Sequence, residues 1–250
     1  MSFRIIARLD VKPPNLVKGI HLEGFRKIGD PADFALKYYQ HGADEINYQD
    51  IVASLYDRNN ISELVSKTAK GVFIPISVGG GIRKIDDAKK LLRSGADKVC
   101  INTAALKNPK IISEIAGVFG RQAVVLGIEA KKMNDSWIVM TENGREHANK
   151  HVLDWVIEAV NYGVGEILLT SIDMEGTMKG FDLELINAVA KIVECPVIAH
   201  GGAGTIQDIV LAAKSGASGV AVASMLHYGK FEIKEIKDNL ATSGLSVRIV

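Results

Sequence analysis

The chain has 250 residues, 47% of them hydrophobic, and a formal net charge of +1 at pH 7. This length suits one large α/β barrel or two small domains. The near-neutral charge gives no sign of binding to nucleic acid or to an acidic membrane. The amino terminus lacks a signal-peptide pattern and no apolar run would span a bilayer, so we expect a cytoplasmic protein with neither nucleic acid nor membrane as a partner. Cys100 and Cys195 both fall in predicted strands and are expected to be buried, reduced thiols.

Strands and helices alternate along the first half of the chain. Short runs rich in β-branched residues predict the strands, and polar capping residues followed by proline or acidic residues predict the helix starts. A long polar segment rich in Gly and Pro follows the first strand. The predicted strands are residues 4–10, 45–50, 74–82 and 98–101, and the predicted helices begin at Asp30, Ser62, Ile85 and Asn108.

The second half repeats the pattern. The predicted strands are residues 123–130, 166–171, 197–200 and 219–223, a small hairpin is expected near 137–141, and helices are expected at 151–162, after Asp182, after Thr205 and at 233–240. Strands alternating with helices, with no composition break that would mark a linker, predict a single (β/α)8 TIM barrel domain over residues 1–250. A doubly wound open sheet is the alternative.

Three motifs recur at a single offset of 121 residues, which predicts an internal duplication with halves of about 1–121 and 122–250. Each half contains a strand that follows a proline and ends in a glycine-rich turn. The matching pairs are Ile74–Ile82 with Cys195–Gly204, Ser94–Asp97 with Ser215–Ser218, and Gly42–Glu45 with Gly163–Glu166.

Glycine turns and strand ends form two candidate phosphate sites. In a barrel of this class the active site lies at the carboxyl ends of the strands. One site combines Gly79–Gly81 with Asn102 and Thr103, and the other combines Gly201–Gly202 with Ala223 and Ser224. Glycines let a dianion approach backbone amides closely, and helix starts add partial positive charge. Tight strand-to-helix packing is the alternative for either turn alone, but two such sites predict a substrate with a phosphate at each end.

Two carboxylates lie between these sites. Asp10 and Glu129 end the first and fifth predicted strands, and a facing pair of carboxylates suits general acid and base work. Capping or surface roles are the alternative for each. Lys18, in the long segment after the first strand, is a candidate for folding over a bound phosphate, and a solvated loop lysine is its alternative.

Seven stretches resemble the cyclase subunits of imidazole glycerol phosphate synthases, with the similarity running from Arg4 to about Val247. These stretches are Leu9–Lys12, Leu16–Gly19, Gly29–Pro31, Val78–Arg83, Asp97–Ala105, Gly165–Asp173 and Gly201–Gly204. The resemblance implies a duplicated barrel enzyme of histidine biosynthesis, a lyase without a cofactor or metal. It would add ammonia from a glutaminase to a bisphosphorylated ribulosyl-formimino aminoimidazole carboxamide ribonucleotide, giving imidazole glycerol phosphate and aminoimidazole carboxamide ribonucleotide.

The resemblance also implies roles for individual residues. Asp10 would be one acid/base, and Glu129 stands where the family has a second carboxylate, an aspartate. Glu175 likewise stands at a usual aspartate. The implied ligand-binding residues are Gly81, Asn102 and Thr103 for one phosphate, Gly202, Ala223 and Ser224 for the other, Lys18 on a mobile loop, and Thr170 lining the site.

At the opposite end of the barrel, the resemblance implies a gate for ammonia. Arg4, Glu45, Lys98 and Glu166 begin four predicted strands with alternating charge and match the charged ring of the family. Asp97 matches a partner-facing position. A glutaminase subunit, bound as a heterodimer, is therefore expected, and a salt-bridged barrel floor is the alternative for the ring.

Several interior positions depart from the family. Strand alternation places Arg8 one layer below Asp10, where the family usually has a small residue, and places Asn47 and Gln49 on the face of the gate. Asp10 or Glu129 is the expected partner of Arg8. His200, just before the second glycine turn, is expected to be either a phosphate ligand or a packed histidine.

These departures leave three alternatives to the cyclase. The first is a paralogue that uses glutaminase-derived ammonia on another acceptor, such as a nucleotide sugar in surface polysaccharide synthesis. The second is the related barrel isomerase of the same pathway, which shares two phosphate sites. The third is a non-catalytic module that activates a glutaminase.

Overall fold

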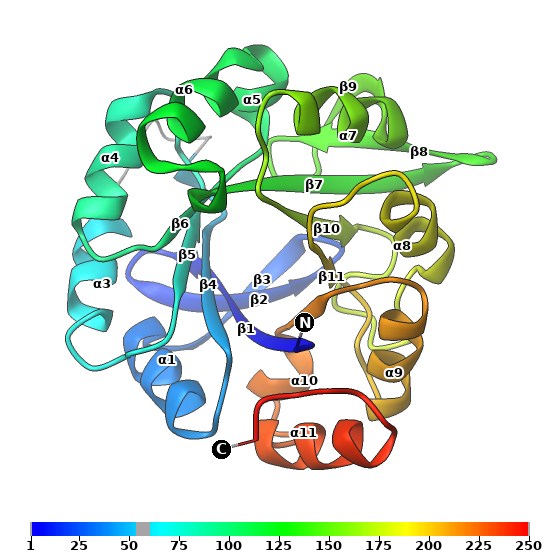
Figure 1. Cartoon of the computed structure of the whole chain (residues 1–250). Helices are drawn as coiled ribbons and strands as arrows, with labels where there is room; N and C mark the ends of the chain where they lie inside the picture. Colours follow the sequence, from blue (N-terminus) through cyan, green and yellow to red (C-terminus); the bar gives the residue numbers. More distant parts are fainter. Residues whose placement is uncertain (1, 54–60, 250) are drawn as a thin grey trace.

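The computed structural model describes residues 2–53 and 61–249, and it is a closed parallel barrel surrounded by helices (Figure 1). The barrel strands follow the order β10-β11-β12-β1-β4-β5-β6-β7, and pairing of β7 with β10 closes the ring. Their bounds are β1 (Arg4–Lys12), β4 (Glu45–Asp50), β5 (Ile76–Gly79), β6 (Lys98–Ile101), β7 (Val124–Met133), β10 (Glu166–Ser171), β11 (Val197–His200) and β12 (Gly219–Val222). The predicted (β/α)8 barrel is confirmed, and the open-sheet alternative is wrong.

Helices cover the outside of the barrel, one after nearly every strand (Figure 1). Two starts agree with the predicted caps: the Asp30 carboxylate accepts from Ala32 N–H at 2.8 Å, and Thr205 and Asp208 form a reciprocal capping box. Ser62 instead lies inside its helix, and the helix expected at Asn108 begins at Lys110. The long helices are α1 (Pro31–Gln40), α3 (Ile61–Thr68), α4 (Ile85–Arg93), α6 (Lys110–Phe119), α7 (Val152–Asn161), α8 (Leu183–Ala190), α9 (Ile206–Lys214) and α11 (Ile233–Thr242).

Strand alternation divides the side chains between an outer core and the barrel interior. On β4, Ile46 and Tyr48 point outward into the main core under the helices and are fully buried. The alternate residues Glu45, Asn47 and Gln49 point inward, and side chains of this kind determine the chemistry of the lumen. Cys100 and Cys195 are buried free thiols, as predicted.

Two antiparallel hairpins extend the barrel strands beyond the carboxyl-end rim. β2 (Asn15–Ile20) and β3 (Glu23–Gly29) follow β1, while β8 (Ser136–Thr141) and β9 (Glu146–His151) follow β7. The first hairpin replaces the irregular polar segment that we expected. Antiparallel pairing of β1 with β2, for example Asp10 with Val17, makes this segment a strand although its sequence lacks a long alternating pattern.

Three short helical segments were not predicted: α5 (Thr103–Lys107), α10 (Ser224–His227) and the 3-10 turn η1 (Arg121–Ala123). Each is too short to show a helical period in the sequence. Across residues 2–53 and 61–249, no helix combines the length and the apolar character needed to cross a membrane.

Candidate active site

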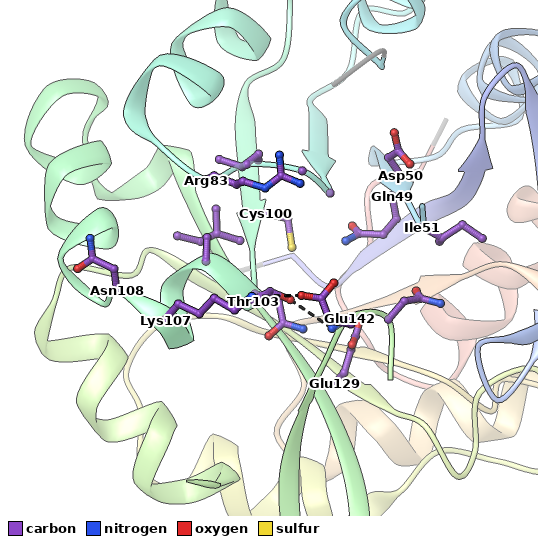
Figure 2. A pocket seen from close by; sticks show the side chains of 17 residues that line it. Gln49, Asp50, Ile51, Arg83, Cys100, Thr103, Lys107, Asn108, Glu129 and Glu142 are labelled. Carbon is purple, nitrogen blue, oxygen red and sulfur yellow. Dashed lines mark hydrogen bonds and ion pairs between the residues drawn. The ribbon is translucent and has the colours of Figure 1, made fainter. Parts of the chain in front are cut away.

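A cavity of about 270 Å³, which we call the main cavity because predicted rim residues line it, opens at the carboxyl ends of β4, β5, β6 and β7. Figure 2 shows side chains from different strands converging on it, with Gln49 and Asp50 on one side, Thr103 on another, and Glu129 facing them. Gly80 and Gly81 also line it, as does Asn102. The first predicted phosphate site and one predicted acid/base residue therefore share a cavity.

Glycine is required in the turn beside this cavity. Gly80 has φ +99° and Gly81 has φ +70°, a region that other residues adopt at a cost. A Cβ on Gly80 would also lie 2.2 Å from the carbonyl oxygen of Asp50. Asn102 then begins α5 with φ −128° and ψ −88°. Because Gly80 and Gly81 have no side chains, their backbone atoms form this part of the cavity wall.

The second glycine turn has nearly the same conformation. Gly201 has φ +97° and Gly202 has φ +106°, and a Cβ on Gly202 would lie 1.8 Å from the carbonyl oxygen of Gly180. Ala223 begins α10 with φ −128° and ψ −81°, which matches Asn102 at the 121-residue offset. The cavity beside this turn, which Ser224 also lines, measures only about 20 Å³. The two turns are alike, but in this conformation only the first has room for a ligand.

Arg8, Asp10, Lys18 and Glu175 form a buried chain of alternating charges. Arg8 Nε donates to Asp10 Oδ1 at 2.9 Å, and Lys18 Nζ lies 3.7 Å from Asp10 Oδ2. Lys18 also forms a close ion pair with Glu175. All four side chains are at most 3% exposed, and the expected pairing of Arg8 with Asp10 is thereby confirmed. Asp10 contributes to the wall of neither cavity.

The charges around Asp10 hold it ionised. Burial raises the pKa of Asp10, but the adjacent charges of Arg8 and Lys18 outweigh burial and keep this pKa at about 2, below the ordinary 3.8. Its Oδ2 atom has no hydrogen-bond partner among the described residues. Asp10 is thus a carboxylate with one oxygen free of hydrogen bonds.

Glu129 has the opposite electrostatic environment. Burial raises the pKa of Glu129 from 4.5 to about 7, although the Gly144 N–H and the charge of Arg8 lower it. The Gly144 N–H donates to Oε2 at 2.8 Å and orients the side chain from the β8–β9 hairpin. Two neighbouring carboxyl groups with pKa values pushed apart are typical of an acid/base pair. Glu129 exchanges a proton near neutral pH, while Asp10 stays charged.

Lys18 differs from the expectation of a mobile loop residue. It lies in strand β2, is 2% exposed, and its Nζ donates to the Gly19 carbonyl at 3.1 Å as well as contacting Glu175. Glu175 in turn accepts from Leu22 N–H at 2.9 Å, so it ties the β2–β3 hairpin down over the second glycine turn. Lys18 and Glu175 both line the small cavity.

Thr170 and His200 lie near the Arg8 side chain. Arg8 Nη1 donates to Thr170 Oγ1 at 3.4 Å. His200 Nδ1 lies 2.9 Å from the Ala221 carbonyl and donates to it, which leaves Nε2 as an acceptor. Burial and the charge of Arg8 lower the pKa of His200 well below 6.5, so the ring is neutral. His200 is therefore packed, but it also lines the small cavity.

The predicted charged residues at the opposite end of the barrel form a closed ring. Arg4 pairs with Glu45 at 3.2 Å and closely with Glu166, and Lys98 pairs with Glu45 at 2.7 Å and with Glu166 at 3.1 Å. Burial raises the pKa of Glu45 although Lys98 lowers it. Asp97 is exposed nearby, and its carboxylate accepts from Ile76 N–H at 2.8 Å.

Two cavity residues, Glu142 and Asn143, were not predicted; they lie in the turn of the β8–β9 hairpin. Glu142 N–H donates to Thr103 Oγ1 at 3.3 Å, and its carboxylate faces Lys107 at 3.4 Å (Figure 2). Neither Glu142 nor Asn143 lies at the end of a barrel strand, which is where active-site residues were expected from the sequence. In the described residues, no group of three His, Cys, Asp or Glu side chains is arranged to hold a metal ion.

The fold and this rim define a (β/α)8 barrel with two glycine-rich turns at the carboxyl ends of its strands and a pair of buried carboxyl groups, the arrangement of a barrel enzyme. Comparisons with known proteins identify the family. The model of the family described as "Histidine biosynthesis protein" matches residues 4–232. The chain belongs to this family, and it is an enzyme with the cyclase role in histidine biosynthesis.

Several similar proteins are named imidazole glycerol phosphate synthase subunit HisF. That of Legionella pneumophila is 62% identical over 208 residues, covering 83% of this chain and 98% of that protein. The subunit of Streptococcus sanguinis strain SK36 is 47% identical over 98% of both chains, and that of Natranaerobius thermophilus is 46% identical over the full length of both. These names support the cyclase function. They do not support the alternative of a paralogue that acts on a nucleotide sugar.

Proposed function

We propose that the chain adds ammonia to the bisphosphorylated ribulosyl-formimino aminoimidazole carboxamide ribonucleotide and releases imidazole glycerol phosphate and aminoimidazole carboxamide ribonucleotide. The observation that carries this proposal is the pair of equivalent glycine cradles, 121 residues apart, with two carboxyl groups between them. An extended substrate with a phosphate at each end fits such a pair. Its central, reacting part would then lie over the carboxyl groups.

Each half of the rim would bind one phosphate. Gly81, Asn102 and Thr103 would hold one of them in the main cavity. Gly202, Ala223 and Ser224 would hold the other beside α10. The second cavity is small while Lys18 and Glu175 are paired, so substrate binding would require the β2–β3 hairpin to move. That movement would also uncover Asp10, and it would free the Lys18 ammonium for the phosphate.

The carboxyl groups would divide the proton transfers. Glu129, with its pKa near 7, would donate and accept protons on the reacting nitrogen and carbon atoms. Asp10, held as a carboxylate by Arg8, would orient an N–H or O–H group of the substrate and stabilise positive charge that develops there. Thr170 and Glu175 would position the Arg8 and Lys18 side chains through the contacts described above.

Ammonia would come from a glutaminase subunit, bound as a heterodimer at the amino ends of the strands. The closed ring of Arg4, Glu45, Lys98 and Glu166 lies at that end and would act as its gate. Asp97, exposed beside the ring, would face the partner. The relatives are named as subunits of a synthase, which supports a partner of this kind. We expect the complex to be cytoplasmic.

The direct test is a cyclase assay on the purified chain alone. The bisphosphorylated ribonucleotide is supplied with a large excess of ammonium salt, and the loss of substrate absorbance is followed. We expect turnover at ordinary enzyme rates without the partner, because ammonium replaces glutamine as the nitrogen source. Binding of the ribonucleotide without turnover would overturn the proposal and favour a binding module instead.

A further inference from the structure

The two glycine turns differ at the residue that precedes them. Gly79 precedes the first turn and His200 the second, at the same 121-residue offset. Each pairs in register with the neighbouring strand, Gly79 with Gln49 and His200 with Thr170. In the first half the large side chain belongs to the neighbouring strand, since a Cβ on Gly79 would lie 2.3 Å from Gln49 Oε1. In the second half the large side chain is His200, on the strand that carries the turn itself.

His200 offers one ring nitrogen to a ligand. The side chain is 4% exposed and lines the small cavity together with Gly202 and Ser224. Its Nδ1 lies 2.9 Å from the Ala221 carbonyl, and because a carbonyl only accepts, this nitrogen carries the ring proton. Nε2 is therefore an acceptor, and it has no hydrogen-bond partner among the described residues. A buried acceptor without a partner costs free energy, so Nε2 is suited to a ligand that brings a donor.

The charged groups around His200 keep its ring neutral in this structure. Burial and the charges of Arg8 on β1 and Lys18 on β2 lower the pKa of His200, whereas Asp10 on β1 raises it. Glu175 lines the same cavity but is paired with Lys18. The remaining residues of the cavity wall are uncharged, as are the neighbours of His200 in register on β10 and β12.

A phosphate at the second glycine turn would change this balance. A phosphate monoester loses its second proton at a pKa of about 6, so at pH 8 it is a dianion with acceptors and no donor. Such a dianion beside His200 Nε2 would set two acceptors against each other. One proton between Nε2 and a phosphate oxygen replaces this repulsion with a charge-assisted hydrogen bond.

We propose that His200 is a ligand of the phosphate at the second glycine turn, and that one proton, taken up from solvent on binding, joins Nε2 to a phosphate oxygen. This inference rests on the proposed function, which places a phosphate at Gly202, Ala223 and Ser224. The two ends of the substrate then differ in their pH dependence. The first half has Gly79 at the equivalent position, which has no side chain to share a proton.

The test counts the protons taken up when the bisphosphorylated ribonucleotide binds to the purified chain at pH 8 without ammonium. Titration calorimetry in buffers of different ionisation enthalpy gives this number. His200→Asn removes Nε2 and keeps a donor at the level of Nδ1 for the Ala221 carbonyl. We expect the wild type to take up about one proton more than this variant, and its affinity to fall about tenfold more than that of the variant between pH 7 and pH 8.

His227→Asn is the matched control. His227 also has a buried Nε2 atom without a partner, and its Nδ1 lies 2.7 Å from the Tyr38 hydroxyl, but it is not part of the wall of the small cavity. Its proton number should equal that of the wild type. His200→Gln supplies an amide N–H near the level of Nε2 that does not titrate. This variant should bind more tightly than His200→Asn at pH 8, without the additional proton.

Thermal unfolding of each variant reports its stability, and if His200→Asn does not fold, the proton number of the wild type is compared with that of His200→Gln. Equal proton numbers in the wild type and the His200 variant, with the ribonucleotide bound by both, would overturn this inference alone. Weaker binding by His200→Asn without a change in proton number would also overturn it, because Nε2 would then accept from a hydroxyl group of the ligand. A wild-type chain that does not bind the ribonucleotide would overturn the proposed function as well.

Discussion

The raised pKa of Glu129 predicts that this side chain lowers the stability of the folded protein at neutral and alkaline pH. In the folded chain its pKa is about 7, against an ordinary 4.5. A carboxyl group of this kind binds its proton more tightly in the folded state than in the unfolded state. Its contribution to stability is therefore fully present below pH 4.5 and is lost as the pH rises to 7.

The substitution Glu129→Gln removes the titratable proton but keeps a carbonyl oxygen to accept from Gly144 N–H. The difference of the two pKa values, at 1.36 kcal/mol per unit, corresponds to up to about 3 kcal/mol at pH 8 and about 1 kcal/mol at pH 5. We therefore expect the variant to be more stable than the wild type, by an amount that grows with pH. Such a gain on removing an active-site group is a stability-activity trade-off.

The assay is urea unfolding of both proteins at pH 5 and at pH 8, compared as free energies of unfolding. Glu142→Gln is the control, since it removes another carboxylate of the same cavity, one that faces the exposed Lys107 at 3.4 Å. A Glu129→Gln variant that is destabilised equally at both pH values would contradict the raised pKa of Glu129 as the cause of a stability cost. The side chain would then contribute packing or hydrogen bonds that outweigh the cost of burying its charge.

Three further predictions concern the carboxyl pair and the second glycine turn. Asp10→Asn should abolish turnover with ligand affinity nearly unchanged, and because it leaves the buried Arg8 without a charged partner, urea unfolding should show a loss of about 3 kcal/mol. An active Asp10→Asn enzyme would remove Asp10 from the reaction. Glu129→Asp should retain or raise the ammonium-dependent rate, since the family carries aspartate there; complete loss would mean that the pocket is built around glutamate. Gly202→Ala should lower the unfolding free energy by more than about 2 kcal/mol, because the new Cβ meets the Gly180 carbonyl at 1.8 Å and the backbone has φ +106°. Gly229→Ala is the control, because Gly229 has φ +64° and open space around it, so this variant measures the cost of a positive φ without a steric clash. An equal loss of unfolding free energy in both variants would show that the contact with the Gly180 carbonyl adds nothing.

Much of the barrel was predictable because its signals are local. Short β-branched runs, capping residues such as Asp30 and Thr205, and glycines at the turns act within a few residues of the chain. The order of strands and helices follows from them, and the barrel follows from that order. The half-barrel duplication rests on the 121-residue offset alone and stays a prediction, as do the roles of the site residues.

The hairpins were less predictable because their pairing depends on partners elsewhere. Nothing in the sequence around Lys18 indicates that it lies in a strand beside β1, buried against Glu175, which follows it by 157 positions. Glu142 likewise depends on distant pairing, since it lines the main cavity from the β8–β9 hairpin, and β8 pairs with the extension of β7. A sequence window does not contain the contacts that fix either residue.

Local pattern and strand period in the sequence were enough to predict where the two glycine turns fall and which charges begin the strands at the opposite end. They did not predict all the strand ends at the rim, since β1 and β7 continue past Asp10 and Glu129 into hairpins. Only the folded barrel shows that Asp10 is held ionised while Glu129 titrates near pH 7, and that the side-chain oxygens of Asn47 and Gln49 have no hydrogen-bond partner among the described residues. Burial and electrostatic neighbours are properties of the closed barrel. They arise where side chains from distant strands meet across its axis.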